Sequence, residues 1–245
     1  MRFNNQSPKK WLALCGLIIS ILIFCVGELK AETFTVTKTA DTNDGVCDSD
    51  CSFREAIIAA NARLGEDSIL VPSGTYTRTS FFPAVIDDVK IIGEEVGVTV
   101  IDANAIGGSV LAIGGSGKVE ISNLTIQGGV GGGISKMEGD LTITNCMIKG
   151  NSASLGGGIS NRRGALTLKS TTVTGNSTTA AFVGYGGGGI HNTGTLTMID
   201  SKVIENFTVA YGGGIYNGAT VNIMNSTISG NITRVGGAGI FNLSG

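Results

Sequence analysis

Short stretches in which apolar and polar side chains alternate dominate the second half of the chain. In residues 141–144 and 166–169, leucine or isoleucine alternates with threonine or lysine. A period of two places the apolar side chains on one face of an extended strand. The stretches are too short and too rich in threonine, serine and glycine for helices, and no proline follows Pro83. The pattern therefore predicts many short β-strands whose N–H groups nearly all donate to neighbouring strands.

A longer repeat is superimposed on this alternation. GGGISN, GGGIHN, GGGIYN and GAGIFN end at Asn161, Asn192, Asn217 and Asn242, and a shorter GGGIS ends at Ser135. The isoleucines of these five segments are separated by 25, 31, 25 and 25 residues. A unit of this length cannot bury its apolar face alone, so successive units stack with their strands about 4.8 Å apart. We predict an all-β, single-stranded parallel β-helix, which is a solenoid of stacked rungs.

Stacking places equivalent side chains of successive rungs in columns. Asparagines in one column can bond to each other through their side-chain amides and satisfy backbone groups at the corners. The two predicted columns are Asn161, Asn192, Asn217 and Asn242, and Asn151, Asn176, Asn206 and Asn231. Cys146 occupies a third column with Thr171, Ser201 and Ser226, so we expect it to be a small buried filler.

The segment CSFREAIIAANARLGEDS (51–68) has a helical pattern. Ser52 and Glu55 form an S-x-x-E capping box. The apolar residues on one helical face are Phe53, Ile57, Ala60 and Leu64. Because the end of a solenoid is an open sheet edge that must be covered, we predict a short N-terminal capping helix. Residues 68–77 and 88–103 then form the first rungs.

The first 31 residues have the pattern of a secretory signal peptide. Arg2, Lys9 and Lys10 precede the apolar run 11–26, and cleavage is predicted after Ala31. The alternative is an uncleaved membrane anchor, but sixteen residues fall short of the roughly 20 needed to span a bilayer. We therefore expect an exported protein that is secreted or displayed at the cell surface.

Export leaves three cysteines, and an oxidising compartment favours a disulfide between Cys47 and Cys51. A zinc site would need further ligands, and the chain contains a single histidine. Residues 32–102 carry 5 Lys/Arg and 13 Asp/Glu, whereas residues 103–245 carry 8 and 5. Neither part has the basic stripe of a nucleic-acid-binding protein.

Residues 34–61, FTVTKTADTNDGVCDSDCSFREAIIAAN, resemble the N-terminal CSLREA-type domain of bacterial secreted proteins, with Phe53 in place of leucine. The rungs resemble the right-handed parallel β-helix of the pectin-lyase-like superfamily. Their GGGI and [IV]xxN elements are similar to the repeats of polymorphic outer membrane proteins. After the predicted signal peptide (1–31), the resemblance implies a CSLREA-like cap (32–68) and a right-handed β-helix (69–245). Because residue 245 falls part-way through a rung, we expect a C-terminal truncation.

Candidate catalytic and metal-binding groups are few. Asp41, Asp44, Asp48 and Asp50 offer oxygen ligands for calcium, but their spacing differs from that of an EF-hand. We expect a solvated acidic loop there and no cofactor. After residue 103, Glu120 stands alone in its column, Asp200 and Glu205 lie at different corners, and Glu138 and Asp140 share one turn. No paired-carboxylate or calcium-lyase arrangement is visible.

One rung carries about five extra residues, in the segment 177–185. Loops on solenoids often hold binding function. Aromatic and basic residues on or beside this loop could form an outward face that contacts a sugar or a protein. The candidate binding residues are Phe182, Tyr185, His191, Tyr216, Phe241, Arg162 and Arg163. The alternative is a tolerated surface bulge.

Three functions are compatible with these features. The first is a secreted or cell-surface bacterial β-helix that acts by binding, like an adhesin, with a polysaccharide or a surface protein as partner. The second is a polysaccharide lyase or hydrolase whose catalytic rungs lie elsewhere, and the third is a structural spacer in the envelope. We expect no nucleic-acid partner, and membrane association only through the signal peptide or a missing C-terminal anchor.

Overall fold

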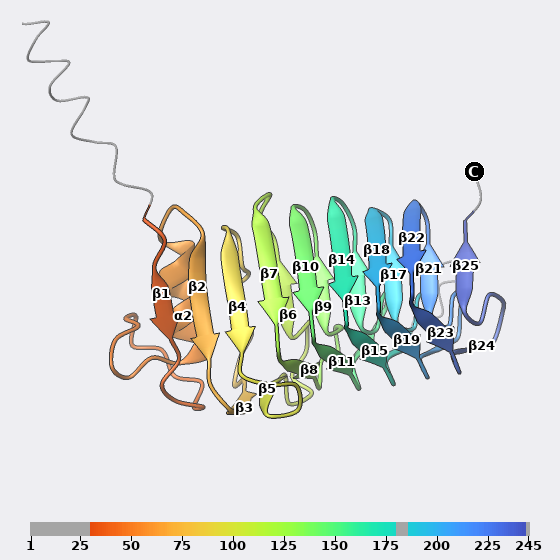
Figure 1. Cartoon of the computed structure of the whole chain (residues 1–245). Helices are drawn as coiled ribbons and strands as arrows, with labels where there is room; N and C mark the ends of the chain where they lie inside the picture. The colour runs from red at the N-terminus through yellow and green to blue at the C-terminus, as the bar shows by residue number, and fades with distance from the viewer. Residues whose placement is uncertain (1–29, 180–185, 244–245) are drawn as a thin grey trace, which may run out of the picture. The chain divides into compact units, whose positions relative to one another are not determined.

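The computed structural model describes residues 30–179 and 186–243. Within the unit Ala31–Gly245, the chain winds through parallel sheets in successive rungs (Figure 1). The described residues form an all-β parallel β-helix of about seven turns with one short helix, so the predicted fold class is confirmed. The predicted signal peptide, residues 1–31, lies outside the described residues except for its last two positions.

Among the described residues, two sheets contain the largest numbers of strands, eight and seven. The first sheet consists of β1 (Thr33–Thr35), β2 (Asp67–Val71), β4 (Val89–Gly93), β7 (Lys118–Ser122), β10 (Asp140–Thr144), β14 (Ala165–Lys169), β18 (Thr195–Ile199) and β22 (Thr220–Met224). The second consists of β3 (Gly74–Thr77), β5 (Thr99–Asp102), β8 (Thr125–Gln127), β11 (Met147–Lys149), β15 (Thr172–Thr174), β19 (Lys202–Ile204) and β23 (Thr227–Ser229).

Two further sheets complete each rung. The third sheet consists of β12 (Ser152–Ala153), β16 (Ser177–Thr178), β20 (Phe207–Thr208) and β24 (Ile232–Thr233). The fourth consists of β6 (Leu111–Ile113), β9 (Ile134–Lys136), β13 (Ile159–Asn161), β17 (Ile190–Asn192), β21 (Ile215–Asn217) and β25 (Ile240–Asn242). The recurring GGGI-x-N segments thus supply the fourth sheet.

Apolar side chains of successive rungs stack on one another inside the coil. Leu141 pairs in register with Leu166, and Ile159 lies between Ile134 and Ile190. All five side chains are buried. Because full burial of a leucine or isoleucine contributes about 1.5–3 kcal/mol, columns of this kind supply most of the stabilising free energy of each rung.

The two predicted asparagine columns are present as continuous hydrogen-bonded rows. The row in the fourth sheet runs from Asn161 to Asn192, Asn217 and Asn242 through Nδ2–H···Oδ1 bonds of 2.7, 2.7 and 3.0 Å. The second row runs from Asn151 to Asn176, Asn206 and Asn231 with three bonds of 3.0 Å. These amides also bond to corner backbone groups, as in the 3.2 Å bond from Asn151 to the carbonyl of Ile126.

The helix α2 (Phe53–Asn61) packs on β1 and β2 at the start of the coil. Its predicted apolar face is buried at Phe53, Ile57 and Ala60. Leu64 is an exception, with 75% of its surface exposed. The helix ends at Asn61, because the chain turns away before Gly65, which has a φ of 128°. The predicted helical face is therefore one turn too long.

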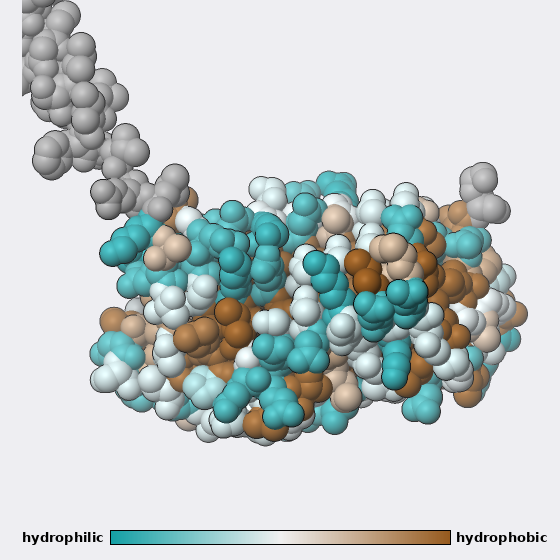
Figure 2. All heavy atoms as spheres, in the orientation of Figure 1, coloured by the Kyte–Doolittle hydropathy of each residue, from teal (hydrophilic) through white to brown (hydrophobic). Residues whose placement is uncertain are grey.

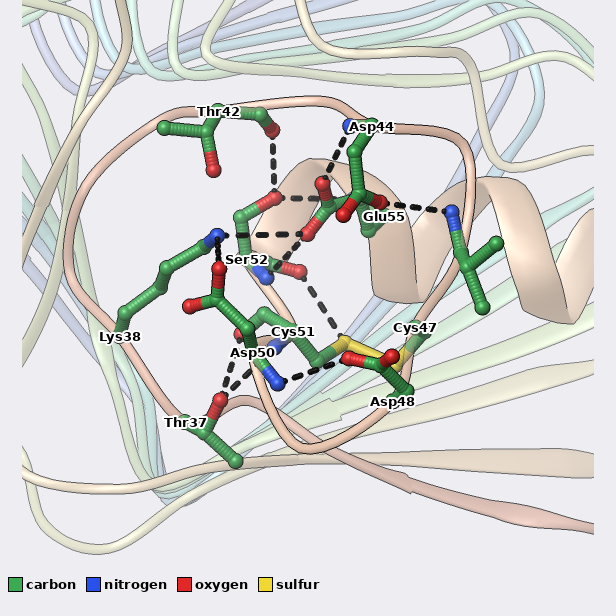
Figure 3. Close-up of a disulfide and its surroundings, with 11 residues drawn as sticks. Thr37, Lys38, Thr42, Asp44, Cys47, Asp48, Asp50, Cys51, Ser52 and Glu55 are labelled. Atoms are coloured by element: carbon green, nitrogen blue, oxygen red, sulfur yellow. Dashed lines mark hydrogen bonds and ion pairs between the residues drawn. A yellow bond between two sulfur atoms is a disulfide. The ribbon is translucent and has the colours of Figure 1, made fainter.

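A compact polar network holds the loop that precedes α2 (Figure 3). Cys47 and Cys51 form a disulfide. The capping box is complete, with the Glu55 carboxylate accepting from the backbone N–H of Ser52 at 2.6 Å. The same carboxylate accepts from the backbone N–H of Asp44 at 2.8 Å. One buried glutamate therefore joins the helix start to the disulfide loop.

The described surface mixes polar and apolar patches (Figure 2). Toward the last rungs, apolar side chains gather on the visible face, and Ile223 and Met224 of β22 are 38% and 49% exposed. Among the described residues, no helix has the length and apolar character required to span a bilayer.

Candidate functional site

The predicted aromatic column exists as a stack of rings. His191, Tyr216 and Phe241 occupy equivalent positions of β17, β21 and β25. The His191 and Tyr216 rings are nearly parallel, with centroids 4.9 Å apart, and the Tyr216 and Phe241 centroids are 5.5 Å apart. Tyr211 stacks on Phe241 at 4.3 Å and extends the stack. Stacked arrangements of this kind stabilise neighbouring rungs.

The stack is largely buried, so His191 and Tyr216 do not form an exposed aromatic surface. These side chains are only 5% and 1% exposed. Each ring is covered by the ring of the next rung, and the backbone of Gly186 also contacts His191. Burial lowers the pKa of His191, against a smaller opposing effect of Gly186, so this imidazole is held neutral. A buried stack of this kind is a packing element.

The arginines of the predicted binding face lie at the surface. Arg162 and Arg163 are exposed, and Arg163 forms a surface ion pair with Glu138 at 3.1 Å. Phe182 and Tyr185 lie outside the described residues. The structure thus brings together the three ring residues, and the charge of Arg162 also acts on His191, whereas Arg163 is paired with Glu138.

Three of the four candidate calcium ligands already form hydrogen bonds or an ion pair in the loop that precedes α2 (Figure 3). Asp44 accepts from the backbone N–H of Val46 at 3.0 Å, and Asp48 accepts from that of Asp50 at 2.9 Å. Asp50 forms an ion pair with Lys38 at 2.8 Å. These contacts stabilise tight turns, and the three carboxylates face different partners.

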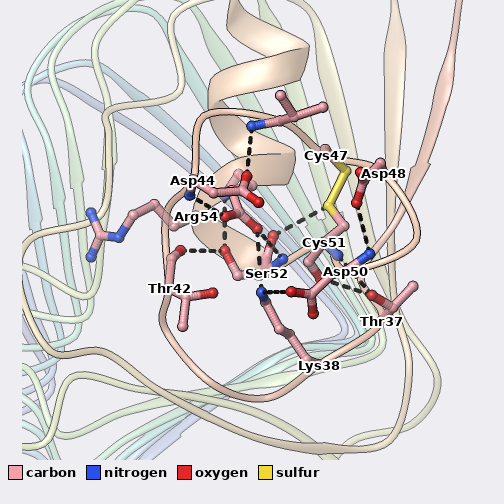
Figure 4. A network of polar contacts seen from close by, with 12 residues as sticks. Thr37, Lys38, Thr42, Asp44, Cys47, Asp48, Asp50, Cys51, Ser52 and Arg54 are labelled. Carbon is pink, nitrogen blue, oxygen red and sulfur yellow. Dashed lines mark hydrogen bonds and ion pairs between the residues drawn. A yellow bond between two sulfur atoms is a disulfide. The ribbon is translucent and has the colours of Figure 1, made fainter.

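The fourth candidate, Asp41, is committed to Arg54 at the start of α2. Its two oxygens accept from Nε and Nη2 of Arg54, each at 2.8 Å, and the backbone N–H of Thr79 donates to it at 2.6 Å. Figure 4 shows Arg54 extending away from the disulfide loop. Within the described ranges, no three His, Cys, Asp or Glu side chains are grouped closely enough to hold a metal ion.

Sequence reasoning missed one buried cation in the fourth sheet. Lys136 is fully buried and pairs in register with Asn161, at the position where later rungs have asparagine. Its Nζ donates to Asn161 Oδ1 at 3.0 Å and to the carbonyl of Arg163. The signal was available, because aligning Ile134 with the later isoleucines places Lys136 in the asparagine column.

An open trough runs along the corner that follows the second sheet. Its volume is about 490 Å³, and its lining residues are Gln127, Gly128, Lys149, Gly150, Thr174 and Gly175. They are the last residues of β8, β11 and β15 and the glycines that follow, in three consecutive rungs (lower edge of Figure 1). The trough therefore has a glycine floor and one wall formed by an amide, an ammonium and a hydroxyl group.

The glycine floor is required by backbone geometry. Gly128, Gly150 and Gly175 have φ values of 75°, 61° and 60°, a left-handed conformation that glycine adopts without strain. A Cβ added at Gly150 or Gly175 would meet no atom within 4 Å, so the space above the floor is open.

Carboxylates stand at both ends of the trough. At one end, Asp102 accepts from Gln127 Nε2 at 2.8 Å and would collide with a side chain at position 128. At the other end, Glu205 occupies the equivalent left-handed position with a φ of 56°. A glutamate in this conformation costs about 1–2 kcal/mol relative to glycine. Asp200 and Glu205 lie at opposite ends of β19, as predicted, and so form no pair within one corner.

Comparisons with known proteins add a likeness in fold alone. No family model matches the chain, and no curated protein matches it. A solved structure of a pectin methylesterase mutant in complex with a hexasaccharide is similar, with a TM-score of 0.47 and 12% identity. The similarity covers 81% of this chain and 67% of that one. The resemblances to the CSLREA-type domain and to polymorphic outer membrane proteins stay predictions from the sequence.

Proposed function

We propose that this chain is an exported or surface-displayed β-helix that acts by binding, and that the glycine trough holds an extended polyhydroxyl chain such as a polysaccharide strand. The observation that carries the proposal is the repetition of one polar side chain per rung beside an open floor of glycines. Gln127, Lys149 and Thr174 stand in register, so their polar groups recur about every 4.8 Å.

Such a repeat suits a polymer whose units each offer hydroxyl groups at a similar spacing. The amide of Gln127 and the hydroxyl of Thr174 can each donate and accept, whereas the ammonium of Lys149 donates only. Lys149 forms no ion pair with any described residue. Its charge is therefore free for an acidic sugar, and we expect uronate-containing glycans to bind more tightly than neutral ones.

Filling the trough floor tests this proposal. The substitutions Gly150→Asn and Gly175→Asn place a side chain above the floor, and asparagine tolerates the left-handed backbone better than other residues. The matched control is Gly230→Asn, which lies in the same column with a φ of 64° but outside the trough. Binding of oligogalacturonate, chito-oligosaccharide and dextran fragments is measured by calorimetry for the purified full chain and each variant.

We expect at least a tenfold loss of affinity in the two trough variants and none in the control. Equal affinities in Gly150→Asn and the unmodified chain would place the binding site elsewhere, and no binding of any probe would contradict the proposed function. Release of unsaturated uronides from oligogalacturonate during the titration would instead support the lyase alternative.

A further inference from the structure

Asp67, the first residue of β2, carries a buried carboxylate with only one hydrogen-bond partner in the described part of the chain. The residue is 0% exposed. Its Oδ1 accepts from the backbone nitrogen of Glu32 at 2.7 Å. Its Oδ2 is buried and has no hydrogen-bond partner among the described residues.

A buried carboxylate of this kind is costly unless a cation neutralises it. Among residues 30–179 and 186–243, no lysine, arginine or histidine forms an ion pair with Asp67. Neighbouring cations have other partners, since Arg63 pairs with Glu32 at 2.7 Å and Lys90 with Glu66 at 3.0 Å. The guanidinium of Arg78 donates to backbone carbonyls of residues 106, 107 and 109. The described residues of the uncut chain therefore form no ion pair with this carboxylate.

Glu32 is fixed so that its main-chain nitrogen faces Asp67. The carbonyl of Glu32 accepts from the N–H of Ser68 at 2.8 Å, and its side chain is held by Arg63. Thr33, the next residue, pairs in register with Ser68 as β1 joins β2. The group aimed at the carboxylate is thus the nitrogen of the residue that directly follows the predicted cleavage point.

We propose that the peptide bond between Ala31 and Glu32 is hydrolysed during export, and that the new α-ammonium group of Glu32 forms a buried ion pair with Asp67. The reaction consumes one water and is catalysed by an endopeptidase that cuts after small residues. The C–N bond breaks, the water oxygen joins the carbonyl carbon of Ala31, and the nitrogen of Glu32 gains protons to become –NH₃⁺. Ala31 and Glu32 are both exposed and lie outside any strand.

Cleavage changes the charge and the number of N–H donors at one atom, the main-chain nitrogen of Glu32. The amide nitrogen of the uncut chain offers one N–H and no charge, whereas an ammonium offers three N–H groups and a positive charge. The ammonium can therefore donate to both carboxylate oxygens, and charge-assisted bonds are about twice as strong as neutral ones. Processing thus fastens β1 to β2 at the edge of the first sheet.

The first test uses the full chain exported from a bacterial host. The intact mass of the purified protein gives its N-terminus, which we expect at Glu32. The α-amine is then acylated at pH 7, and its labelling rate is compared between the unmodified protein and Asp67→Asn. A buried ion pair predicts labelling at least tenfold slower in the unmodified protein. A mature N-terminus at another residue, or equal labelling rates, would overturn the proposal.

The second test measures coupling between the terminus and the carboxylate. A chain with Ala-Gln inserted after Ala31 leaves an extension after cleavage there, so the nitrogen of Glu32 stays an amide. Asp67→Asn is expected to lower the melting temperature of the Glu32-terminated form by about 3 °C or more, and to leave the extended form unchanged or stabilised. Asp88→Asn, one rung further, is the control and is expected to affect both forms equally. Equal effects of Asp67→Asn on the two forms would contradict the ion pair.

Discussion

At the scale of single residues, Lys136 shows how one substitution ends a repeating row. The asparagine amides of the fourth sheet all point the same way, since each Nδ2 donates to the Oδ1 of the next rung. The carbonyl end of the row is therefore Asn161, where the Nζ of Lys136 donates. A cation at the negative end of aligned dipoles is favourable, as it is at a helix C-terminus.

The protonation of Lys136 should appear in the stability of the protein. Burial lowers the pKa of this ammonium to about 8, against a smaller opposing effect of the Asp140 carboxylate. Between about pH 8 and the ordinary value of 10.5, the unfolded chain binds more protons than the folded one, so stability should rise with pH. We expect Lys136→Asn to remove this rise in denaturant titrations from pH 7 to 10.5.

A matched substitution separates the charge of Lys136 from its hydrogen bonds. Asparagine can still donate to Asn161, whereas Lys136→Met leaves that oxygen and the carbonyl of Arg163 without this donor. We expect Lys136→Met to be less stable than Lys136→Asn by about 1–3 kcal/mol at pH 7. A steep rise in stability above pH 8 that persists in Lys136→Asn would contradict the assignment.

Several residue positions could be predicted from the sequence because a fixed period determines them. The asparagine rows and the burial of Cys146 follow directly from aligning the rungs. The burial of His191 and Tyr216 could not be predicted this way. A period of two identifies which side chains share a face, but it does not reveal that rings from adjacent rungs cover one another on a strand of three residues. The trough could not be predicted, because the period places its glycines in one column but does not reveal that the space above them is open.

At the scale of elements, the short strands are held in register by polar rows as well as apolar columns. Asn192 illustrates this, since it is fully buried and links β13, β17 and β21. Its Nδ2 also donates to the carbonyls of Gly194 and Thr220 at 3.0 and 2.9 Å. Each such asparagine serves three strands at once, so the repeat of asparagine is a structural requirement.

Removal of one amide from the row should destabilise its neighbours. Asn192→Ala leaves the Nδ2 of Asn161 and the Oδ1 of Asn217 without their row partner inside the coil. We expect a loss of about 3 kcal/mol in the free energy of unfolding, measured by denaturant titration. The control is Asn222→Ala on the exposed face of β22, which should change stability by less than about 0.5 kcal/mol. Equal effects of the two substitutions would show that the row contributes little.

At the scale of the whole described unit, each rung contacts mainly the rungs before and after it. Stability in such a solenoid is nearly a sum over neighbours, so a perturbation at the start opens nearby rungs first. The cap concentrates its titratable contacts at that start, around Glu55 and Asp41. Periodicity predicted this cap as a helix, but the acidic network could not be predicted, because its partners lie in loops without a repeat.

Acid should therefore open the molecule from its capped end. Burial alone would raise the pKa of Glu55, but the N–H groups of Ser52 and Asp44 outweigh burial and hold that pKa below its ordinary 4.5. Burial also acts to raise the pKa of Asp41, but the hydrogen bonds from Arg54 and Thr79 outweigh burial and hold that pKa below its ordinary 3.8. Stability from both groups is complete above these ordinary values and is lost as pH falls through the lower folded-state values.

Hydrogen exchange resolves where this loss occurs. At pH 3, relative to pH 7 and after correction for intrinsic rates, we expect protection to fall at least tenfold in β1 and β2 while β14 and β18 keep theirs. Glu55→Gln should produce the same local loss already at pH 7, whereas Glu138→Gln, in an exposed ion pair, should not. A uniform loss of protection along all rungs would instead mean that the coil unfolds as one cooperative unit. The cap would then stabilise rungs that it does not contact.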